Sequence, residues 1–450
     1  MSRTIFALSS GAVPSGVAVI RISGPDAKDV LRLLGGNDIP EPRRAFLRSL
    51  YHPFTEDHLD DALALYFPEP NSFTGEDVVE LQCHGGRAVV AGILEVLSEM
   101  DNCRPADPGE FTRRAFHNGQ MDLTEVEGLA DLIAAETEAQ KKQALRQMGG
   151  ALGFLYDGWR ERLIQMRALI EADFDFADEE DVPGSVADEI WLEASRLASE
   201  VEEHLLQSRH GERLRSGLQV VLMGAPNAGK SSLLNAIAGR DVAIVTEEAG
   251  TTRDIIEVHL DLGGYPVTLV DTAGLRKTEG VVEREGIRRA QERGVAADLI
   301  LWAVEPEGVM PGDPEAGMAN TDFGSVPVWI VRTKSDLETL PERDSFEMNY
   351  EIPCSVRSRH GLDDLVDQLS SFVGETISLS ETPLATRQRH RHYLDECLRS
   401  LRTAIANEQL PQELRAEDLR RAADALGRIT GRIDVEDLLD VIFRDFCIGK

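Results

Sequence analysis

The segment that most constrains the fold begins at Gly224. There a strand-like run, residues 218–223, is followed by GAPNAGKS and then by the helical sequence SLLNAIAG. This is the G-x-x-x-x-G-K-S pattern in a strand–loop–helix context. Its glycines let backbone N–H groups face phosphate oxygens, Lys230 can reach the β- and γ-phosphates, and Ser231 can ligate Mg²⁺. The segment predicts a parallel α/β domain that binds a nucleoside triphosphate.

Later motifs follow in the order that a GTPase needs. Residues 250–254 read GTTRD, where Thr252 can complete the metal shell, and the strand VTLV then leads into DTAG, in which Asp271 can hold Mg²⁺ through water. Residues 333–336 read TKSD, and the carboxylate of Asp336 can accept two hydrogen bonds from guanine that adenine cannot donate. The chain is therefore predicted to bind GTP in preference to ATP.

Two of these motifs depart from the usual pattern. The first residue of the base motif is usually Asn, so Thr333 predicts a slightly looser base pocket. GTPases commonly place Gln after the DTAG glycine to orient the attacking water, but this chain has Leu275, which has no polar atom to do so. Another group must position the water, and the acidic residues on the same segment are the candidates: Glu279, Glu283 and Glu285.

The residues predicted from these motifs to contact GTP lie in five short segments, the last of which stands where GTPases carry Ser-Ala-x. They are Asn227, Ala228, Gly229, Lys230, Ser231, Ser232, Gly250, Thr251, Thr252, Asp271, Thr272, Ala273, Gly274, Thr333, Lys334, Ser335, Asp336, Ser355, Val356 and Arg357. Among them, Ser231 and Thr252 are the predicted Mg²⁺ ligands.

Length and periodicity predict several domains. At 450 residues the chain has room for about three. Residues 1–120 mix β-rich and helical segments, residues 121–210 are helical, residues 216–375 alternate strands with helices, and residues 380–450 return to amphipathic helices. We therefore expect a multidomain α/β plus all-α protein, with an α+β N-terminal domain and a P-loop domain inserted into a helical domain.

The amino-acid composition limits the compartments and the partners expected for this chain. The net charge of −32 repels polyanions at long range unless positive charge is locally concentrated. Five scattered cysteines without a C-x-x-C pair argue against a disulfide framework and a structural zinc site. The chain begins with no secretory signal and carries no apolar run of about 18 residues, so we expect a cytoplasmic protein without a membrane partner.

The motifs together resemble those of the bacterial tRNA modification GTPases. The likeness covers essentially the whole chain and includes NSFTGEDVVELQCHGG, RPADPGEFTRRAF and the final FCIGK. It implies a homodimeric GTPase with a Ras-like G domain that works with an FAD-containing partner protein. The pair would install an aminomethyl-type group at C5 of the tRNA wobble uridine, with a tetrahydrofolate one-carbon derivative bound in a dimerising N-terminal domain.

The same resemblance implies how GTP hydrolysis is activated. Members of this family are activated by K⁺ and by dimerisation of G domains, and Asn227 matches the asparagine that coordinates the ion. Residues 246–251 match the loop that completes the K⁺ site, through Thr246, Glu248 and Thr251. Glu247 and Ala249 of this loop join the residues expected near GTP. Glu283 matches the glutamate that orients the attacking water, which makes it the expected catalytic residue.

Folate contacts are also carried over from the resemblance. They fall on Arg21, Glu80 and Lys450, and the family's further lysine corresponds to Gln120 here. Because the glutamate tail of folate is anionic and Gln can only hydrogen-bond to it, folate is expected to bind more weakly than in relatives that keep the lysine. The three main contacts can share one ligand only if the C-terminal helices fold back against the N-terminal domain.

One surface question and two rival functions stay open at this point. A basic cluster after the G domain can meet tRNA phosphate or form a solvated or interdomain helix face; it comprises Arg387, Arg389, His390, Arg391 and His392. A ribosome-assembly GTPase would carry an RNA module such as a KH domain after the G domain, whereas the last 70 or so residues look helical. A dynamin-like membrane remodeller would need a membrane-inserting amphipathic segment, which we do not find.

Overall fold

The computed structural model describes residues 3–39, 41–175, 186–240, 242–244, 256–271, 281–306, 308, 310, 323–337, 351–377, 383–407, 409–433, 439, 442–443, 446 and 449. They form two compact units. The first comprises Met1–Ala130, Gln147–Ser195 and Arg399–Lys450, and the second Asp131–Arg146 and Arg196–Leu398. Within the described ranges, none of the helices combines the length and apolarity needed to cross a bilayer.

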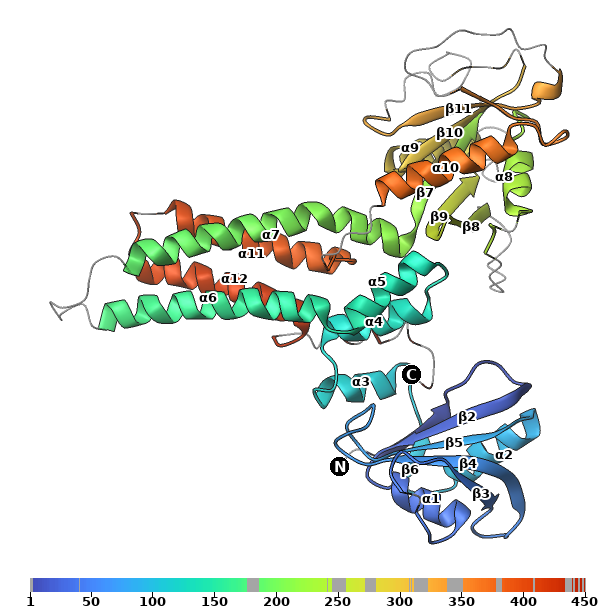
Figure 1. The fold of residues 1–450 in the computed structure, drawn as a ribbon, viewed down its shortest axis with the longest axis vertical. Helices are drawn as coiled ribbons and strands as arrows, with labels where there is room; N and C mark the ends of the chain where they lie inside the picture. Colours follow the sequence, from blue (N-terminus) through green and yellow to red (C-terminus); the bar gives the residue numbers. More distant parts are fainter. Residues whose placement is uncertain are drawn as a thin grey trace. The chain divides into compact units, whose positions relative to one another are not determined.

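A six-stranded sheet with the order β3-β4-β5-β2-β1-β6 organises the start of the first unit (Figure 1). Its pairs are antiparallel except β1 with β6. The elements are β1 (Thr4–Leu8), β2 (Ser15–Ser23), α1 (Ala27–Gly35), β3 (Phe46–Tyr51), β4 (His58–Phe67), β5 (Val78–Gly85), α2 (Arg87–Ser98), β6 (Cys103–Pro105), α3 (Glu110–His117) and α4 (Leu123–Ile133).

Alternation along the strands gives this sheet two different faces. In β2, Ala18, Ile20 and Ile22 are fully buried and pack with residues of α1 and α2. The intervening residues face the other way, so that Arg21 of β2 lies directly across from Glu80 of β5. The sheet therefore has an apolar core on one face and a charged pair on the other.

The helical part of the first unit rests on two long helices, α6 (Ala151–Asp175) and α12 (Gln412–Thr430), which pack against each other (Figure 1). Buried residues recur along α6 every three or four positions, as in a helix that packs along one stripe: Leu152, Tyr156, Trp159, Leu163, Met166 and Ile170. Arg432, just beyond α12, pairs with Asp157 at 2.6 Å. Arg415 of α12 lies over the ring of Trp191 at 3.4 Å.

The second unit is built on a sheet with the order β12-β11-β10-β7-β9-β8, parallel except for the β8–β9 hairpin. Its elements follow the helices α5 (Glu138–Met148) and α7 (Val186–Ser216) and precede α11 (Gln388–Ala406). They are β7 (Leu218–Gly224), α8 (Lys230–Ala238), β8 (Ile256–Leu262), β9 (Tyr265–Asp271), α9 (Val281–Ala296), β10 (Leu299–Val304), β11 (Val328–Arg332), the short 3-10 helix Ser335–Leu337, β12 (Glu351–Pro353) and α10 (Leu362–Thr376).

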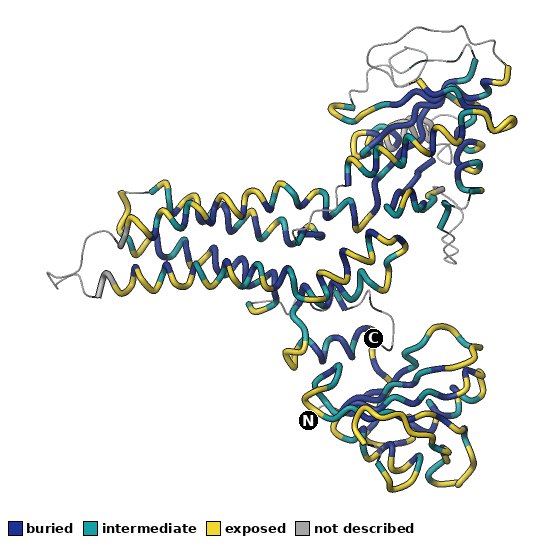
Figure 2. The backbone as a smooth tube through the Cα atoms, viewed as in Figure 1, coloured by how far each residue is buried: buried dark blue, intermediate teal, exposed yellow. Residues whose placement is uncertain are grey.

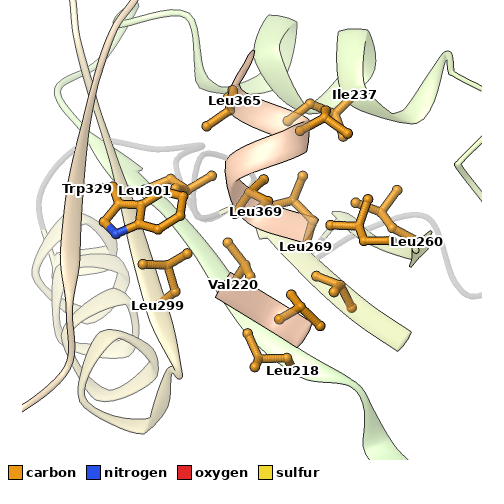
Figure 3. Packing of buried hydrophobic residues seen from close by; sticks show 14 of the residues in the cluster. Leu218, Val220, Ile237, Leu260, Leu269, Leu299, Leu301, Trp329, Leu365 and Leu369 are labelled. Carbon is orange, nitrogen blue, oxygen red and sulfur yellow. The ribbon is translucent and has the colours of Figure 1, made fainter. Parts of the chain in front are cut away.

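Near-continuous apolar runs form the central strands of this sheet, as expected for parallel strands covered on both faces. In β10, all six residues are buried. On one face Leu218, Val220 and Leu301 pack with Leu365 and Leu369 of α10 (Figure 3). Figure 2 shows the buried residues running along the strands of this sheet. The predicted combination of an α+β domain, a helical part and a P-loop α/β fold that interrupts it in sequence is confirmed.

Candidate guanine-nucleotide site

The phosphate-binding loop connects β7 to α8. Gly224 ends β7 with a φ of 133°, and a Cβ built there would meet the carbonyl oxygen of Ala303 in the neighbouring strand β10. Gly229 precedes α8 in the left-handed region, with a φ of 88°. Lys230 is buried, and its Nζ donates to the carbonyl oxygens of Gly224 at 3.1 Å and Ala225 at 2.7 Å. The ammonium group is thus held at the loop itself.

Two oxygen-bearing side chains meet at the start of α8. The hydroxyl of Ser231 donates to Oδ2 of Asp271 at 2.6 Å. Asp271 ends β9, is fully buried, and reaches this position because β9 runs parallel to β7. A hydroxyl and a carboxylate at a helix N-terminus are ligands of the kind that Mg²⁺ prefers, so the residues fit that ion.

The base motif is tied to the phosphate loop by two consecutive side chains. Thr333 is buried, and its hydroxyl donates to the carbonyl oxygen of Ala228 at 2.7 Å. Lys334 donates from Nζ to the carbonyl oxygen of Asn227 at 3.2 Å and forms an ion pair with Glu305. Asn227 itself has a φ of 65°. Thr333 therefore does more than take the place of the usual Asn, because its hydroxyl links the base motif to the phosphate loop.

The carboxylate predicted to read guanine is oriented by a serine. Ser355 donates from Oγ to Oδ1 of Asp336 at 2.6 Å. This hydrogen bond, with a smaller contribution from Arg357, lowers the pKa of Asp336. Gly361 follows with a φ of 71°, and a Cβ there would meet the carbonyl oxygen of Pro353. Asp336 is thus exposed, ionised and held in place, as an acceptor for two N–H groups should be.

Part of the predicted site lies outside the described residues. These positions are Thr246, Glu247, Glu248, Ala249, Gly250, Thr251, Thr252, Thr272, Ala273, Gly274 and Lys450. The backbone of Glu283 lies in the first turn of α9, and its side chain is outside the description. Of the others, Ala228 and Ser335 are buried, and Asn227, Ser232, Val356 and Arg357 are exposed.

The predicted folate residues gather in the first unit. Arg21 and Glu80 form an ion pair at 2.8 Å, and the guanidinium group lies between the rings of Phe73 and Phe111, at 5.2 and 5.8 Å from their centroids. Gln120 approaches the same loop, since a Cβ built at Gly75 would lie 3.2 Å from its Nε2. A cavity of about 340 Å³ adjoins the ion pair, lined by Arg43, Phe67, Asn71, Ser72, Phe73, Val78 and Glu80.

The end of the chain reaches this unit's sheet. Ser9, just after β1, donates from Oγ to the carbonyl oxygen of Gly449 at 2.8 Å. Phe443 packs against Gly109 and, with Leu123 and Val126, forms a small apolar cluster. The expected return of the C-terminal segment to the N-terminal domain is therefore seen in the residues that precede Lys450.

The basic cluster after the G domain is engaged with neighbouring helices. Arg387 pairs with Asp131 at 2.7 Å, Arg391 pairs with Glu212 at 2.9 Å, and His390 is fully buried. Of the two readings that sequence left open, the structure favours a helix–helix face over a tRNA surface. Glu305, the partner of Lys334, lies outside every sequence motif described above. The signal available was its place directly after β10.

The fold and the site define a P-loop GTPase: an α/β sheet carries the phosphate loop, the Ser231–Asp271 pair and the Asp336 carboxylate at one edge. Residues 4–120 match the N-terminus of the GTP-binding protein TrmE, and residues 123–447 match the MnmE helical domain. The chain belongs to the MnmE family.

Curated relatives resemble the chain over nearly its full length. The tRNA modification GTPase MnmE of Parvibaculum lavamentivorans is 52% identical over 99% of this chain and 100% of its own length. That of Brucella ovis is 51% identical over 99% of this chain and 98% of its own. Among solved structures, the G domain of the T. maritima FeoB iron transporter is 23% identical, covers 34% of this chain and 98% of its own, and has a TM-score of 0.25.

Proposed function

We propose that this chain hydrolyses GTP as part of the machinery that adds a (carboxymethyl)aminomethyl group to C5 of the wobble uridine of tRNA. In this proposal it acts in the cytoplasm as a homodimer, together with an FAD-containing partner protein in a heterotetramer. The observation that carries the proposal is the near full-length likeness to relatives named tRNA modification GTPase. The geometry of the nucleotide site supports the part of the proposal that concerns GTP hydrolysis.

The chain's own residues suit each part of GTP binding. Lys230 lies at the phosphate loop, and Asp336 offers an oriented carboxylate to the guanine edge. Ser231 and Asp271 fit a Mg²⁺ ion, with Thr252 as the further proposed ligand; such an ion neutralises charge that develops on the phosphates. We assign Glu283 to orienting the attacking water, because Leu275 cannot and α9 begins two residues before Glu283.

We also propose that K⁺ binds beside the phosphate loop. Asn227 is exposed there, and the hydrogen bond from Lys334 to its carbonyl oxygen helps to fix its backbone, so its side-chain oxygen is a suitable ligand. Thr246, Glu248 and Thr251 are the further proposed ligands. A cation at this place would supply the positive charge that an arginine finger supplies in other GTPases.

The tetrahydrofolate derivative is proposed to bind on the charged face of the first sheet. The aromatic ring of Phe73 offers a stacking surface for a pterin, and Glu80 offers a carboxylate for its N–H groups. Arg21 and Lys450 supply positive charge for the carboxylates of folate, while Gln120 offers only hydrogen bonds. The cavity of about 340 Å³ beside the ion pair supports this assignment.

Calorimetric titration with 5-formyltetrahydrofolate tests the folate site. Glu80→Gln is expected to weaken binding at least tenfold, because it removes a charge-assisted acceptor. Glu95→Gln makes the same change at an exposed position of α2 and should bind as the unaltered protein does. Removing residues 448–450 should also weaken binding. Equal affinity in all four proteins would exclude this pocket.

Mass spectrometry of wobble nucleosides tests the whole function. A strain lacking this protein should lose the C5 modification and regain it when the gene is restored. Asp336→Asn, which removes the guanine-reading carboxylate, should fail to restore it, whereas Asp364→Asn on the exposed side of α10 should succeed. An unchanged nucleoside profile in the deletion strain would refute the proposal.

A further inference from the structure

Helix α5 belongs to the helical stretch of the sequence but packs with the G domain. It lies between α4 and α6 along the chain, and yet residues Asp131–Arg146 fall in the same compact unit as the P-loop sheet. Ala139 is 4% exposed and belongs to the buried cluster that includes Leu218, Leu262 and Val267. The first turn of α5 is therefore part of the apolar core of the G domain.

The same turn contacts the tip of the β8–β9 hairpin (Figure 1). The backbone N–H of Ala139 donates to the carbonyl oxygen of Gly264 at 3.0 Å. Gly263 and Gly264 form the two-residue turn with φ values of 64° and 89°, and Asp261 accepts from the N–H of Gly264 at 2.7 Å. The tip is thus a well-defined turn that α5 holds by a backbone hydrogen bond.

The other end of this hairpin faces the nucleotide site. Strand β8 begins directly after residues 245–255, the segment that contains the proposed switch threonine, and β9 ends at Asp271, which meets Ser231. The two strands are paired in register along their whole length, from Ile256 with Asp271 to Leu262 with Tyr265. In GTPases, contacts to the γ-phosphate order the loops at these strand ends. The hairpin is therefore a fully paired connection between the nucleotide site and its own tip.

Helix α5 also holds the two segments that join the G domain to its neighbouring helices. Gln140 donates from Nε2 to the carbonyl oxygen of Arg215, just before β7, at 3.0 Å. Gln143, which is 7% exposed, donates from Nε2 to the carbonyl oxygen of Leu384, just before α11, at 3.5 Å. A cavity of about 100 Å³ lies among these segments, lined in part by Gln140, Gln143 and Ala144. One helix therefore touches the hairpin tip and both connecting segments.

We propose that α5 is the positioning element that passes a nucleotide-dependent shift of the β8–β9 hairpin to the helical part of the chain, to which α4 and α6 join it covalently. The inference rests on the proposed function, because it assigns α5 to the step that links GTP hydrolysis to tRNA modification. In the described part of the chain, α5 makes no contact with the predicted nucleotide residues. Loss of its hydrogen bond to the hairpin should therefore leave the rate of GTP hydrolysis largely unchanged.

A pair of proline substitutions isolates the hairpin contact. Ala139→Pro removes the N–H that binds Gly264, at a first-turn position that a helix can give to proline. Glu138→Pro places the same residue one position earlier and leaves that N–H in place. Hydrogen exchange of α4, α5 and α6 amides is compared between the GDP and GDP–aluminium fluoride complexes, beside GTP turnover and the wobble-nucleoside profile of complemented cells.

We expect Glu138→Pro to behave as the unaltered protein in all three measurements. Ala139→Pro should keep GTP turnover within about threefold, lose most of the nucleotide-dependent difference in exchange, and restore at least tenfold less modified nucleoside. If Ala139→Pro does not fold, the Ala139 amide of the unaltered protein is measured instead: its hydrogen exchange should differ between the two complexes, and equal exchange would overturn the proposal. The proposal would be overturned if Ala139→Pro kept the nucleotide-dependent difference in hydrogen exchange. It would also be overturned if the GTP turnover of this variant fell as much as its modified nucleoside. Absence of modification with the unaltered protein would instead refute the proposed function.

Discussion

Lowering the pH should destabilise the contact between α7 and α11 through His204. This residue of α7 is 6% exposed, and burial, with a smaller contribution from His390 of α11, lowers the pKa of its imidazole to about 4. The ordinary value of 6.5 applies to the unfolded chain. Between these two values the unfolded chain binds a proton that the folded chain does not, so the folded state loses stability as the pH falls through this window.

The size of the effect follows from the two pKa values. Each unit of difference corresponds to about 1.4 kcal/mol, so the full loss below pH 4 approaches about 3 kcal/mol. Between pH 8 and pH 5.5 the same relation gives about 1 kcal/mol. We choose pH 5.5 for the measurement because the sequence has a pI near 4.7, and the solubility of a protein falls as the pH approaches its pI.

Urea unfolding followed by far-UV circular dichroism at pH 8 and pH 5.5 measures this loss. His204→Leu removes the titrating group, so its free energy of unfolding should fall by about 1 kcal/mol less than that of the unaltered protein between pH 8 and pH 5.5. His360→Gln, at an exposed position before α10, should show the full loss. The comparison uses differences between pH values, so the cost of repacking around the substituted side chain cancels. Equal losses in His204→Leu and the unaltered protein would refute the reasoning.

Three further outcomes concern the nucleotide site. Thr333→Val should weaken GDP and GTP binding by about 5- to 150-fold in fluorescence titrations, because the buried carbonyl of Ala228 loses its donor, while Thr333→Ser stays within about threefold. Asn227→Ala should abolish the difference between GTP turnover in K⁺ and in Na⁺; a difference that survives would exclude Asn227 as a ligand. Gly361→Ala should lower the melting temperature measurably, since its Cβ would meet the carbonyl of Pro353 and its φ is 71°, and an unchanged melting curve would contradict this.

Local motifs were the most predictable part of this molecule. The strand, loop and helix around Lys230 follow from the spacing of GAPNAGKS alone, and the return of Asp271 to Ser231 follows from parallel strands that end at the same sheet edge. Sequence also indicated that Thr333 departs from the usual Asn. It could not show that the hydroxyl would bind Ala228, because that contact depends on how two loops 105 positions apart approach each other.

Long-range pairing was the least predictable part. The basic cluster offered two readings because nothing local reveals that Arg387 meets Asp131, 256 positions away. Helix α5 falls in the range 121–210 predicted as helical, and its periodicity gives no sign that Ala139 enters the core of the G domain. The domain ranges 1–120, 121–210, 216–375 and 380–450 and the roles of the site residues stay predictions.

The pairing of α6 with α12 sets an order of events during synthesis. Arg432 and Asp157, which close this pair, are separated by 275 positions. At about 5 to 20 residues per second, the ribosome needs roughly 14 to 55 s to make the intervening chain. During that interval the apolar stripe of α6, which includes Tyr156 and Trp159, has no α12 to cover it, whereas the inserted P-loop sheet receives its last strand, β12, before α12 begins. Nascent chains halted after the G domain should therefore be the form of this protein that chaperones bind most strongly.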